Sequence, residues 1–296
     1  MINFLKYRLV YFLISAIFIL SGAYFLVRFG LKPAVDFTGG TLLEVELSAS
    51  RSATLSQVKA VLEPQINLAS LQQTGPNSFL LRSHPIDQSQ SLKLQQLLSA
   101  ELDAPVTEKR FATIGPTLGQ ELIKKTLVSL LLAAGFILAY VTFRFKDKKY
   151  GVCAILAMLH DTFIILGSFS FLGYAYGVEV DALFVTALLT ILSFSVHDTI
   201  VVYDRIRENL KTQPKADFAS VVNQAITQTL ARSINNSLTI IFMLMSLFLL
   251  GGDTIKWFIA TLLIGTISGT YSSTFTAAPL LVLWEQLKTK HHTPGV

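Results

Sequence analysis

Long uninterrupted apolar runs constrain the fold of this chain more than any other feature of its sequence. Hydrophobic residues make up 52% of the 296 residues and charged residues only 15%, and the mean hydropathy is +0.54. The apolar residues gather in blocks, and a helix of roughly 20 such residues crosses a hydrocarbon core of about 30 Å. The sequence therefore predicts a polytopic α-helical membrane protein with six transmembrane helices, at about 9–27, 126–143, 151–173, 182–203, 234–251 and 257–284.

The first apolar run is longer than the core of a secretion signal, and the last is longer than one straight membrane crossing needs. The first follows Lys6 and Arg8, as the core of a secretion signal would, but its apolar stretch of about 19 residues exceeds the roughly 7–15 of a signal core. We therefore expect an uncleaved anchor. The last run is too long for one straight crossing, so only part of it is expected to lie in lipid. Trp257 and Trp284 bracket it, as interfacial aromatic residues do.

Basic residues in the short loops lie almost entirely on one side of the predicted membrane. The loops on the opposite side, 174–181 and 252–256, contain only Lys256. Because cytoplasmic loops carry an excess of Lys and Arg, this bias predicts that both termini are cytoplasmic. The basic residues on the predicted cytoplasmic side are Lys6, Arg8, Arg144, Lys146, Lys148, Lys149, Arg205, Arg207, Lys211, Lys215, Arg232, Lys288 and Lys290.

The polar segment between the first two runs is expected to form a small extracytoplasmic α+β domain. Thr54 to Gln57 have the pattern of a capping box before a helix that Pro64 ends. Strand and helix signals follow the order β-α-β-β-α-β, which is the split βαβ pattern of ferredoxin-like domains. The strands are expected at 41–47, 68–73, 78–82 and 106–114, and the second helix at 91–102.

These patterns predict four consecutive parts of the chain. The parts are 1–29 as cytoplasmic N-terminus and first transmembrane helix, 30–122 as extracytoplasmic domain, 123–285 as a five-helix transmembrane bundle, and 286–296 as a cytoplasmic C-terminal tail. A segment of the length of 30–122 is long enough to bury a core of its own.

Two acidic residues interrupt the apolar runs. Asp198 lies inside 182–203, where a carboxylate costs roughly 2.5–3.5 kcal/mol on the lenient insertion scale. Asp161 lies near the middle of the preceding run, and Arg232 stands at the mouth of the next one. Membrane helices retain such residues mostly where a charge moves or is paired. The pattern therefore indicates a membrane protein whose activity is driven by ion movement.

Each of these residues also has a simpler interpretation. Asp198 and Arg232 could form a static buried ion pair that holds two spans together. Arg232 could instead be a positive-inside anchor whose side chain snorkels to the cytoplasmic surface. His160 and Asp161 could line an aqueous path, or Asp161 could be a packing residue that hydrogen-bonds to a neighbouring helix. The sequence leaves these alternatives open.

The last apolar run carries a stripe of small residues. Such a face lets another helix approach closely in lipid. Close packing within the bundle and a sliding or rocking contact explain it equally well, and in both cases the stripe is buried against protein. It consists of Thr261, Gly265, Gly269, Ser273 and Ala277, with Ser268, Ser272 and Thr276 one position before the last three.

Five short motifs occur in a fixed order along the predicted spans. They are Asp36-Phe37-Thr38-Gly39-Gly40 after the first span, Gly115-Pro116-Thr117-Leu118-Gly119 before the second, His160-Asp161 in the third, the stretch from Asp198 to Asn209, and Gln228-Thr229-Leu230-Ala231-Arg232-Ser233. With them the chain resembles, from end to end, the SecF family of the bacterial SecD–SecF export complex, within the resistance-nodulation-division superfamily. One glycine motif alone would be weak evidence, whereas five motifs in order on six spans are strong evidence.

The resemblance implies a subunit of the protein-export machinery of the bacterial cytoplasmic (inner) membrane. Members pair with SecD, associate with the SecYEG channel and use the proton motive force to help draw exported preproteins outward. By resemblance, Asp198 is the proton carrier and Arg232 its charge partner, with protons as coupling ion and no other cofactor. The alternative is an ion-coupled exporter of small molecules or lipids from the same superfamily, although multidrug members have twelve spans and two much larger outer domains.

One residue departs from the family pattern. His197 stands before Asp198, where the family commonly has Asn. An unperturbed imidazole titrates at about pH 6.5, so His197 could join a proton path, or it could be a neutral hydrogen-bonding substitute for Asn.

Both glycine motifs are expected to be structural. Asp36, Gly39 and Gly40 are expected to shape the turn into the outer domain, since glycine adopts backbone angles that other residues resist. The corresponding residues of the second motif are Gly115, Pro116 and Gly119.

Several other functions are not expected from this sequence. It contains no loop of the GxxxxGK[ST] type, so ATP hydrolysis and an enzymatic role are not expected. The His-Asp pairs at 160–161 and 197–198 lie in membrane helices, and no further His or acid cluster completes a metal site. No basic patch is interleaved with aromatic residues, so a nucleic acid is not an expected partner.

Overall fold

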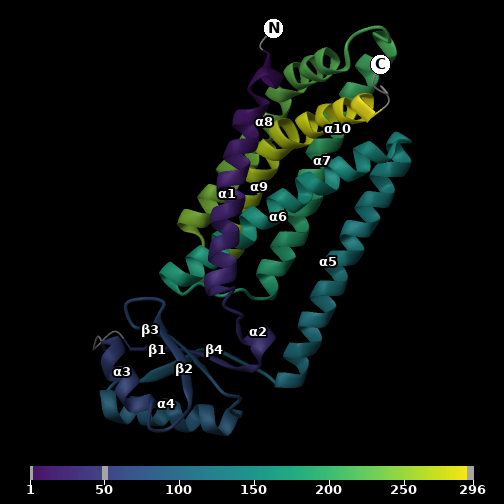
Figure 1. Cartoon of the computed structure of the whole chain (residues 1–296). Coiled ribbons are helices and arrows are strands. Elements are labelled where there is room, and N and C mark those ends of the chain that lie inside the picture. The colour runs from purple at the N-terminus through teal and green to yellow at the C-terminus, as the bar shows by residue number, and fades with distance from the viewer. Residues whose placement is uncertain (1–2, 49–52, 292–296) are drawn as a thin grey trace. The chain divides into compact units, whose positions relative to one another are not determined.

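A computed structural model describes residues 3–48 and 53–291 of the chain. Helices dominate, and the chain divides into two compact units (Figure 1). One unit is Pro33–Leu127, and the other combines the N-terminal helix with the chain from Val128 onward. Each unit has its own cluster of buried apolar side chains.

The unit Pro33–Leu127 is built on a four-stranded antiparallel sheet in the order β2-β3-β1-β4. Leu43, Val45 and Leu47 of β1 alternate along the strand and therefore share one face. Helices α3 and α4 bury Leu62 and Leu98 in the same apolar cluster, so both cover that face. The elements follow the predicted order: β1 (Gly40–Leu47), α3 (Leu55–Leu62), β2 (Leu68–Gln73), β3 (Ser78–Ser83), α4 (Gln88–Leu102) and β4 (Val106–Ile114).

Capping boxes start both helices of this unit. The predicted box is present, with Thr54 and Gln57 bonding reciprocally at the start of α3. A second box, formed by Asp87 and Gln90, starts α4 at Gln88 rather than at the predicted residue 91. The Gln90 and Ser89 donors hold the pKa of the Asp87 carboxyl below its usual value. The apolar pattern of α4 marks its buried face, whereas the cap decides where the helix begins.

The two glycine motifs pack against each other. The first forms a short helix, α2 (Val35–Thr38), that the sequence did not predict, and Gly39 and Gly40 leave it with φ angles of 73° and 130°. The second starts α5 (Pro116–Phe145). A Cβ on Gly119 would lie 2.5 Å from the Phe37 carbonyl oxygen and 3.1 Å from the Gly39 nitrogen. Only a residue without a side chain fits there.

Five described helical segments are long and apolar enough to cross a membrane. They correspond to the first five predicted runs, although each helix extends beyond its apolar run. They comprise η1 (Phe4–Tyr7) continued by α1 (Arg8–Phe29), α5, α6 (Lys148–Tyr176), α7 (Ala182–Thr212) and α8 (Phe218–Leu250).

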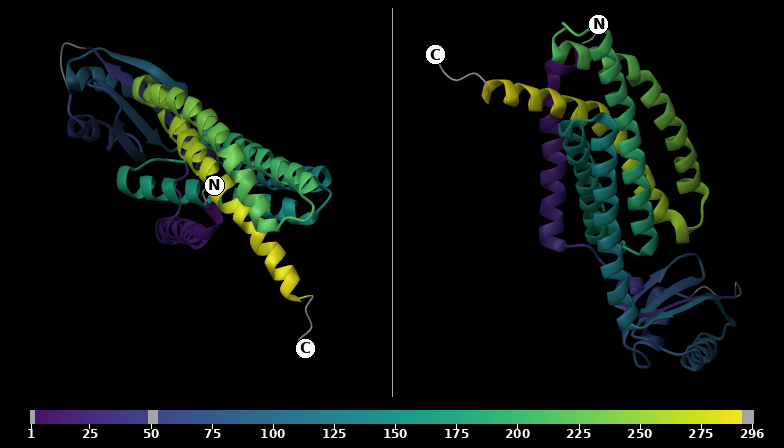
Figure 2. Two further views of the ribbon diagram at one scale, coloured as in Figure 1. Left: turned by 90° about the horizontal axis from the view of Figure 1, so that it is seen from above. Right: turned by 90° about the vertical axis from the view of Figure 1, so that its right-hand side faces the viewer.

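The sixth predicted run is interrupted in the structure. It is divided among α9 (Asp253–Ser272), the π-helical η2 (Ser273–Ala277) and α10 (Ala278–His291). Helix α10 turns away from the line of α9 (Figure 2), and a π turn is a recognised cause of such a bend. The predicted tail 286–296 is helical as far as His291, and its remainder lies outside the described residues.

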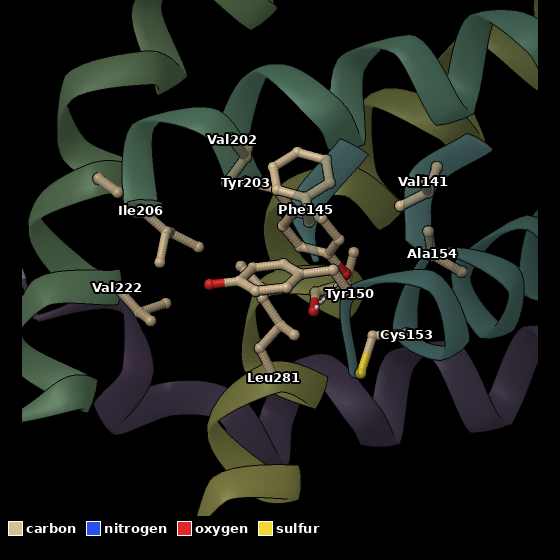
Figure 3. Packing of buried hydrophobic residues seen from close by; sticks show 14 of the residues in the cluster. Val141, Phe145, Tyr150, Cys153, Ala154, Val202, Tyr203, Ile206, Val222 and Leu281 are labelled. Atoms are coloured by element: carbon tan, nitrogen blue, oxygen red, sulfur yellow. Dashed lines mark hydrogen bonds between the residues drawn. The ribbon is translucent and has the colours of Figure 1, made fainter. Parts of the chain in front are cut away.

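A cluster of aromatic and aliphatic side chains joins five helices at one end of the bundle. The ring centroids of Phe145 and Tyr150 lie 5.9 and 5.2 Å from that of Tyr203, and both rings meet it edge to face. Val222 of α8 and Leu281 of α10 belong to the same cluster (Figure 3). The cluster ties α5, α6 and α7 to α8 and α10.

Several of the basic residues predicted to be cytoplasmic also lie at this end. Arg144 pairs with Asp204 at 3.2 Å, and Lys149 pairs with Glu285 at 3.0 Å. Arg8 donates to the Gln286 side chain at 3.0 Å, so the start of α1 and helix α10 lie at the same end of the bundle (Figure 1).

Replacing Gly119 by Ala should destabilise the chain by about 1–3 kcal/mol, because the new Cβ overpacks against the Phe37 carbonyl. Thermal unfolding of the purified full-length chain in detergent measures the effect. Gly135→Ala is the matched control, since Gly135 lies on the same helix and a Cβ added there would have no neighbouring atom within 4 Å. Equal melting temperatures for the two variants would show that the first motif moves aside freely.

Candidate functional site

Asp161 of α6 is enclosed by hydrogen-bond donors in the middle of the helix bundle. Its side chain is 0% exposed. Oδ2 accepts from Ser195 of α7 at 2.5 Å and from Ser272 of α9 at 2.6 Å. Oδ1 accepts from Ser268 of α9 at 2.5 Å and lies 3.0 Å from Nδ1 of His160. Such bonding compensates a carboxylate for the water it loses on burial.

His160 extends this network to the first helix. Its Nε2 lies 3.0 Å from the Ser15 hydroxyl of α1. An ionised Asp161 can only accept, so Nδ1 then carries a proton, and Nε2 of a neutral ring accepts from Ser15. The Tyr271 ring of α9 stacks nearby at 6.1 Å between centroids. A cavity of about 340 Å³ lies beside this network, lined by Ser15, His160, Ser168, Ser268, Tyr271 and apolar residues of α1, α6 and α9.

A pair of glycines explains how Ser15 reaches His160. A Cβ on Gly22 would lie only 3.1 Å from the Gly167 Cα, so α1 and α6 nearly touch there. Gly22 lies seven residues after Ser15, and Gly167 lies seven after His160. Seven residues are about two helical turns, so both contacts lie on the same pair of faces. The two helices therefore run parallel along a close seam.

The small-residue stripe of α9 brings this helix equally close to α7. A Cβ on Gly265 would lie 2.3 Å from a methyl of Ile191, and one on Gly269 would lie 3.1 Å from the Ser195 Cβ. The approach at Gly269 places α9 beside the serine that donates to Asp161. The stripe thus packs helices and also sets the distances within the polar site.

Asp198 of α7 is the second buried acid, with 6% of its surface exposed. Its Oδ2 accepts from Ser233 of α8 at 2.6 Å and from Ser273 of η2. Ser273 follows Ser272, which donates to Asp161. Adjacent residues of one segment therefore contact both acids.

Arg232 and His197 lie outside this cluster. Both side chains are exposed, and neither forms a hydrogen bond or ion pair with Asp198 among the described residues. The structure thus brings Asp198 together with Ser273, and Asp161 with His160. The pairing of Arg232 with Asp198 stays a prediction. No group of three or more His, Cys, Asp or Glu in the described segments could hold a metal ion.

Sequence reasoning identified only some of the serines that donate hydrogen bonds to the two buried acids. Ser268, Ser272 and Ser273 stand out in the sequence only as small packing residues. Ser15 and Ser195 do not stand out at all, because a serine in an apolar run usually bonds its own helix backbone. A search for hydroxyls within one turn of an intramembrane acid would have found Ser195.

The chain matches two families of protein-export proteins. The family described as "Protein export membrane protein SecD/SecF, C-terminal" matches residues 95–287. The family described as "SecD/SecF GG Motif" matches residues 24–50, which include Gly39 and Gly40.

Relatives of known name cover nearly the whole chain. Protein translocase subunit SecF of Thermobaculum terrenum is 41% identical over 302 residues, covering 96% of this chain and 94% of its own. The SecF subunit of Anaerolinea thermophila is 41% identical over 291 residues, with the same coverage. Protein translocase subunit SecDF of Thermus thermophilus is 36% identical over 264 residues, which are 86% of this chain but 35% of that protein.

A solved structure shares the fold. The crystal structure of SecDF from Thermus thermophilus, described as a translocon-associated membrane protein, superposes with a TM-score of 0.84 at 32% identity. The match covers 96% of this chain and 39% of the SecDF chain. The chain therefore belongs to the SecD/SecF family of protein-export membrane proteins.

Proposed function

We propose that this chain is the SecF-type subunit of a bacterial protein translocase and couples proton flow to protein export. The names of its relatives support export rather than the alternative of a small-molecule or lipid exporter. The observation that carries the coupling mechanism is the burial of Asp198 among hydroxyl donors from two other elements.

Hydroxyl partners suit an acid that gains and loses a proton. A serine can donate to a carboxylate, and it can accept from the protonated acid after its own O–H rotates. Ser233 and Ser273 can therefore satisfy both forms of Asp198. A fixed cationic partner would favour the ionised form alone. The arrangement in the structure is thus compatible with proton exchange.

Arg232 is the proposed partner for the release step. It directly precedes Ser233, the residue of α8 that now contacts Asp198. Successive residues of a helix project about 100° apart. A rotation of α8 by that amount would exchange Ser233 for Arg232, and a cation beside Asp198 would favour loss of its proton. For His197 both interpretations remain: it takes part in proton transfer, or it is a neutral hydrogen-bonding substitute for Asn.

A SecD-like protein is the proposed membrane partner. The relative named SecDF combines both names in one chain, of which this chain matches about a third. The apolar windows of α1, α5 and α8 are only 11%, 6% and 17% buried, against 50% for α6 and α7. These exposed faces suit contact with further helices and lipid. The SecYEG channel and exported preproteins are the partners proposed beyond SecD.

The finer architecture belongs to the same proposal. We place six spans in the inner membrane, with α9 as the sixth, because α9 packs along α7 within the bundle. Both termini are cytoplasmic in this proposal, since Arg8, Arg144 and Lys149 lie at the end of the bundle that carries α10. The sheet order β2-β3-β1-β4 supports a ferredoxin-like assignment for the unit Pro33–Leu127, on the outer side.

The variant Asp198→Asn should abolish the stimulation of export by a proton gradient, because it keeps the shape of the side chain but removes the titrating group. Assembly with the partner should survive. The assay is export of a secreted reporter into inverted vesicles, with and without a gradient. Lys148→Ala, an exposed basic residue at the start of α6, is the control. An undiminished response of Asp198→Asn vesicles would falsify the proton-carrier role.

Arg232→Ala should also lower gradient-dependent export, yet leave thermal stability within about 0.5 kcal/mol of the parent, because its side chain is exposed. The same vesicle assay and a melting curve in detergent measure the two effects. A normal response to the gradient would favour the alternative in which Arg232 is only a snorkelling anchor.

Cysteines placed at Ser89 and Lys148 should label from opposite sides of the membrane. Both positions are exposed, and the chain's own Cys153 is buried, so background labelling should be low. A membrane-impermeant maleimide added to intact and to inverted vesicles gives the readout. Labelling of both positions from one side would overturn the proposed topology.

A further inference from the structure

Three serines of the small-residue stripe donate hydrogen bonds to the two buried acids. Ser268 and Ser272 donate to Asp161 at 2.5 and 2.6 Å. Ser273, the next residue along the chain, donates to Asp198. The stripe that the sequence marks as a packing surface therefore also supplies hydroxyl donors to both acids.

The two adjacent serines stand where the helix changes type. Ser272 ends α9, and Ser273 begins the π-helical η2. Successive helical residues project about 100° apart, so these neighbours can reach acids on two different helices, α6 and α7. At the other end of η2, Tyr203 of α7 donates to the carbonyl of Ala277 at 3.2 Å. The π turn is thus held at both ends, and π turns occur frequently at functional sites.

Each of the two hydroxyls has a second acceptor within reach. The Ser273 oxygen lies 3.1 Å from the Thr270 carbonyl oxygen, and the Ser272 oxygen lies 3.3 Å from that of Gly269. A hydroxyl has a single hydrogen to donate. Each serine therefore donates either to its acid or to its own helix.

We propose that Ser272 and Ser273 act as one positioning element that links the protonation of Asp161 to that of Asp198. The inference rests on the proposed proton coupling at Asp198. When Asp198 gains a proton, its O–H donates to Ser273, whose own hydrogen turns to the Thr270 carbonyl. That change shifts the peptide shared with Ser272 and so alters the hydrogen bond to Asp161.

Few other titratable groups adjoin this cluster in the part of the chain that the structure describes. His160 contacts Asp161 directly, and Tyr271 of α9 stacks on the His160 ring. Arg232 of α8 and His197 of α7 adjoin the cluster in sequence but are exposed. The segment η2 contains no acidic or basic residue. The link between the acids is therefore made by hydroxyls.

Infrared titration of the buried carboxyl groups tests this inference. The full chain, with its native partner, is placed in lipid vesicles, and Asp161→Asn and Asp198→Asn assign the two carboxyl bands. Ser272→Ala and Ser268→Ala are a matched pair, because each removes one donor from Asp161 and only Ser272 adjoins Ser273. Ser272→Thr keeps the hydroxyl and should restore the parent titration.

Ser272→Ala should move the titration midpoints of both acids by about one pH unit, which is a tenfold change in proton affinity. Ser268→Ala should move that of Asp161 alone. If both alanine variants act alike on the Asp198 band, the inference is overturned while the proposed proton coupling stands. If no Asp198 band titrates, both the inference and the proposed function are overturned.

Discussion

The hydrogen bonding of Asp161 is the interaction on which the rest of the helix bundle depends. A buried carboxylate without partners is far more costly than a paired one. Its donors come from α6, α7 and α9, so these helices must stay within hydrogen-bond distance of one point. Gly265 and Gly269 permit that approach, because larger side chains there would meet Ile191 and Ser195. Polar bonding and close packing therefore depend on each other.

The uncharged hydrogen-bond partners of Asp198 distinguish its site from a static ion pair. Asp198 contacts Ser233 and Ser273, and neither partner has a charge. Uncharged donors that also accept can follow an acid through both protonation states, whereas a buried Arg would be left without its counter-charge when the acid is neutral. Arg232 is exposed and does not contact Asp198 among the described residues.

Much of the fold could be predicted because its signals are local. Apolar blocks located the five helices that are long and apolar enough to cross a membrane, and alternation with turn residues gave the order of elements in the unit Pro33–Leu127. Predictions from local sequence patterns failed where a tertiary contact or a helix cap determined the structure. Helix α2 is held against Gly119, which lies far along the chain, and α4 starts at a cap that precedes its apolar pattern. The π turn at Ser273 interrupts the sixth apolar run. The length of that run indicated that only part of it crosses the membrane, but not where the helix changes.

The sequence alone determined that acids lie inside membrane helices and that the chain resembles an export family, because composition and motifs are visible residue by residue. Only the tertiary structure decided which partners the acids have. Ser168 donates to the carbonyl of its own helix four residues back, whereas Ser195 donates to Asp161 on another helix. The sequence around each serine does not show which acceptor it takes, because the choice depends on which helix lies opposite and how closely it approaches.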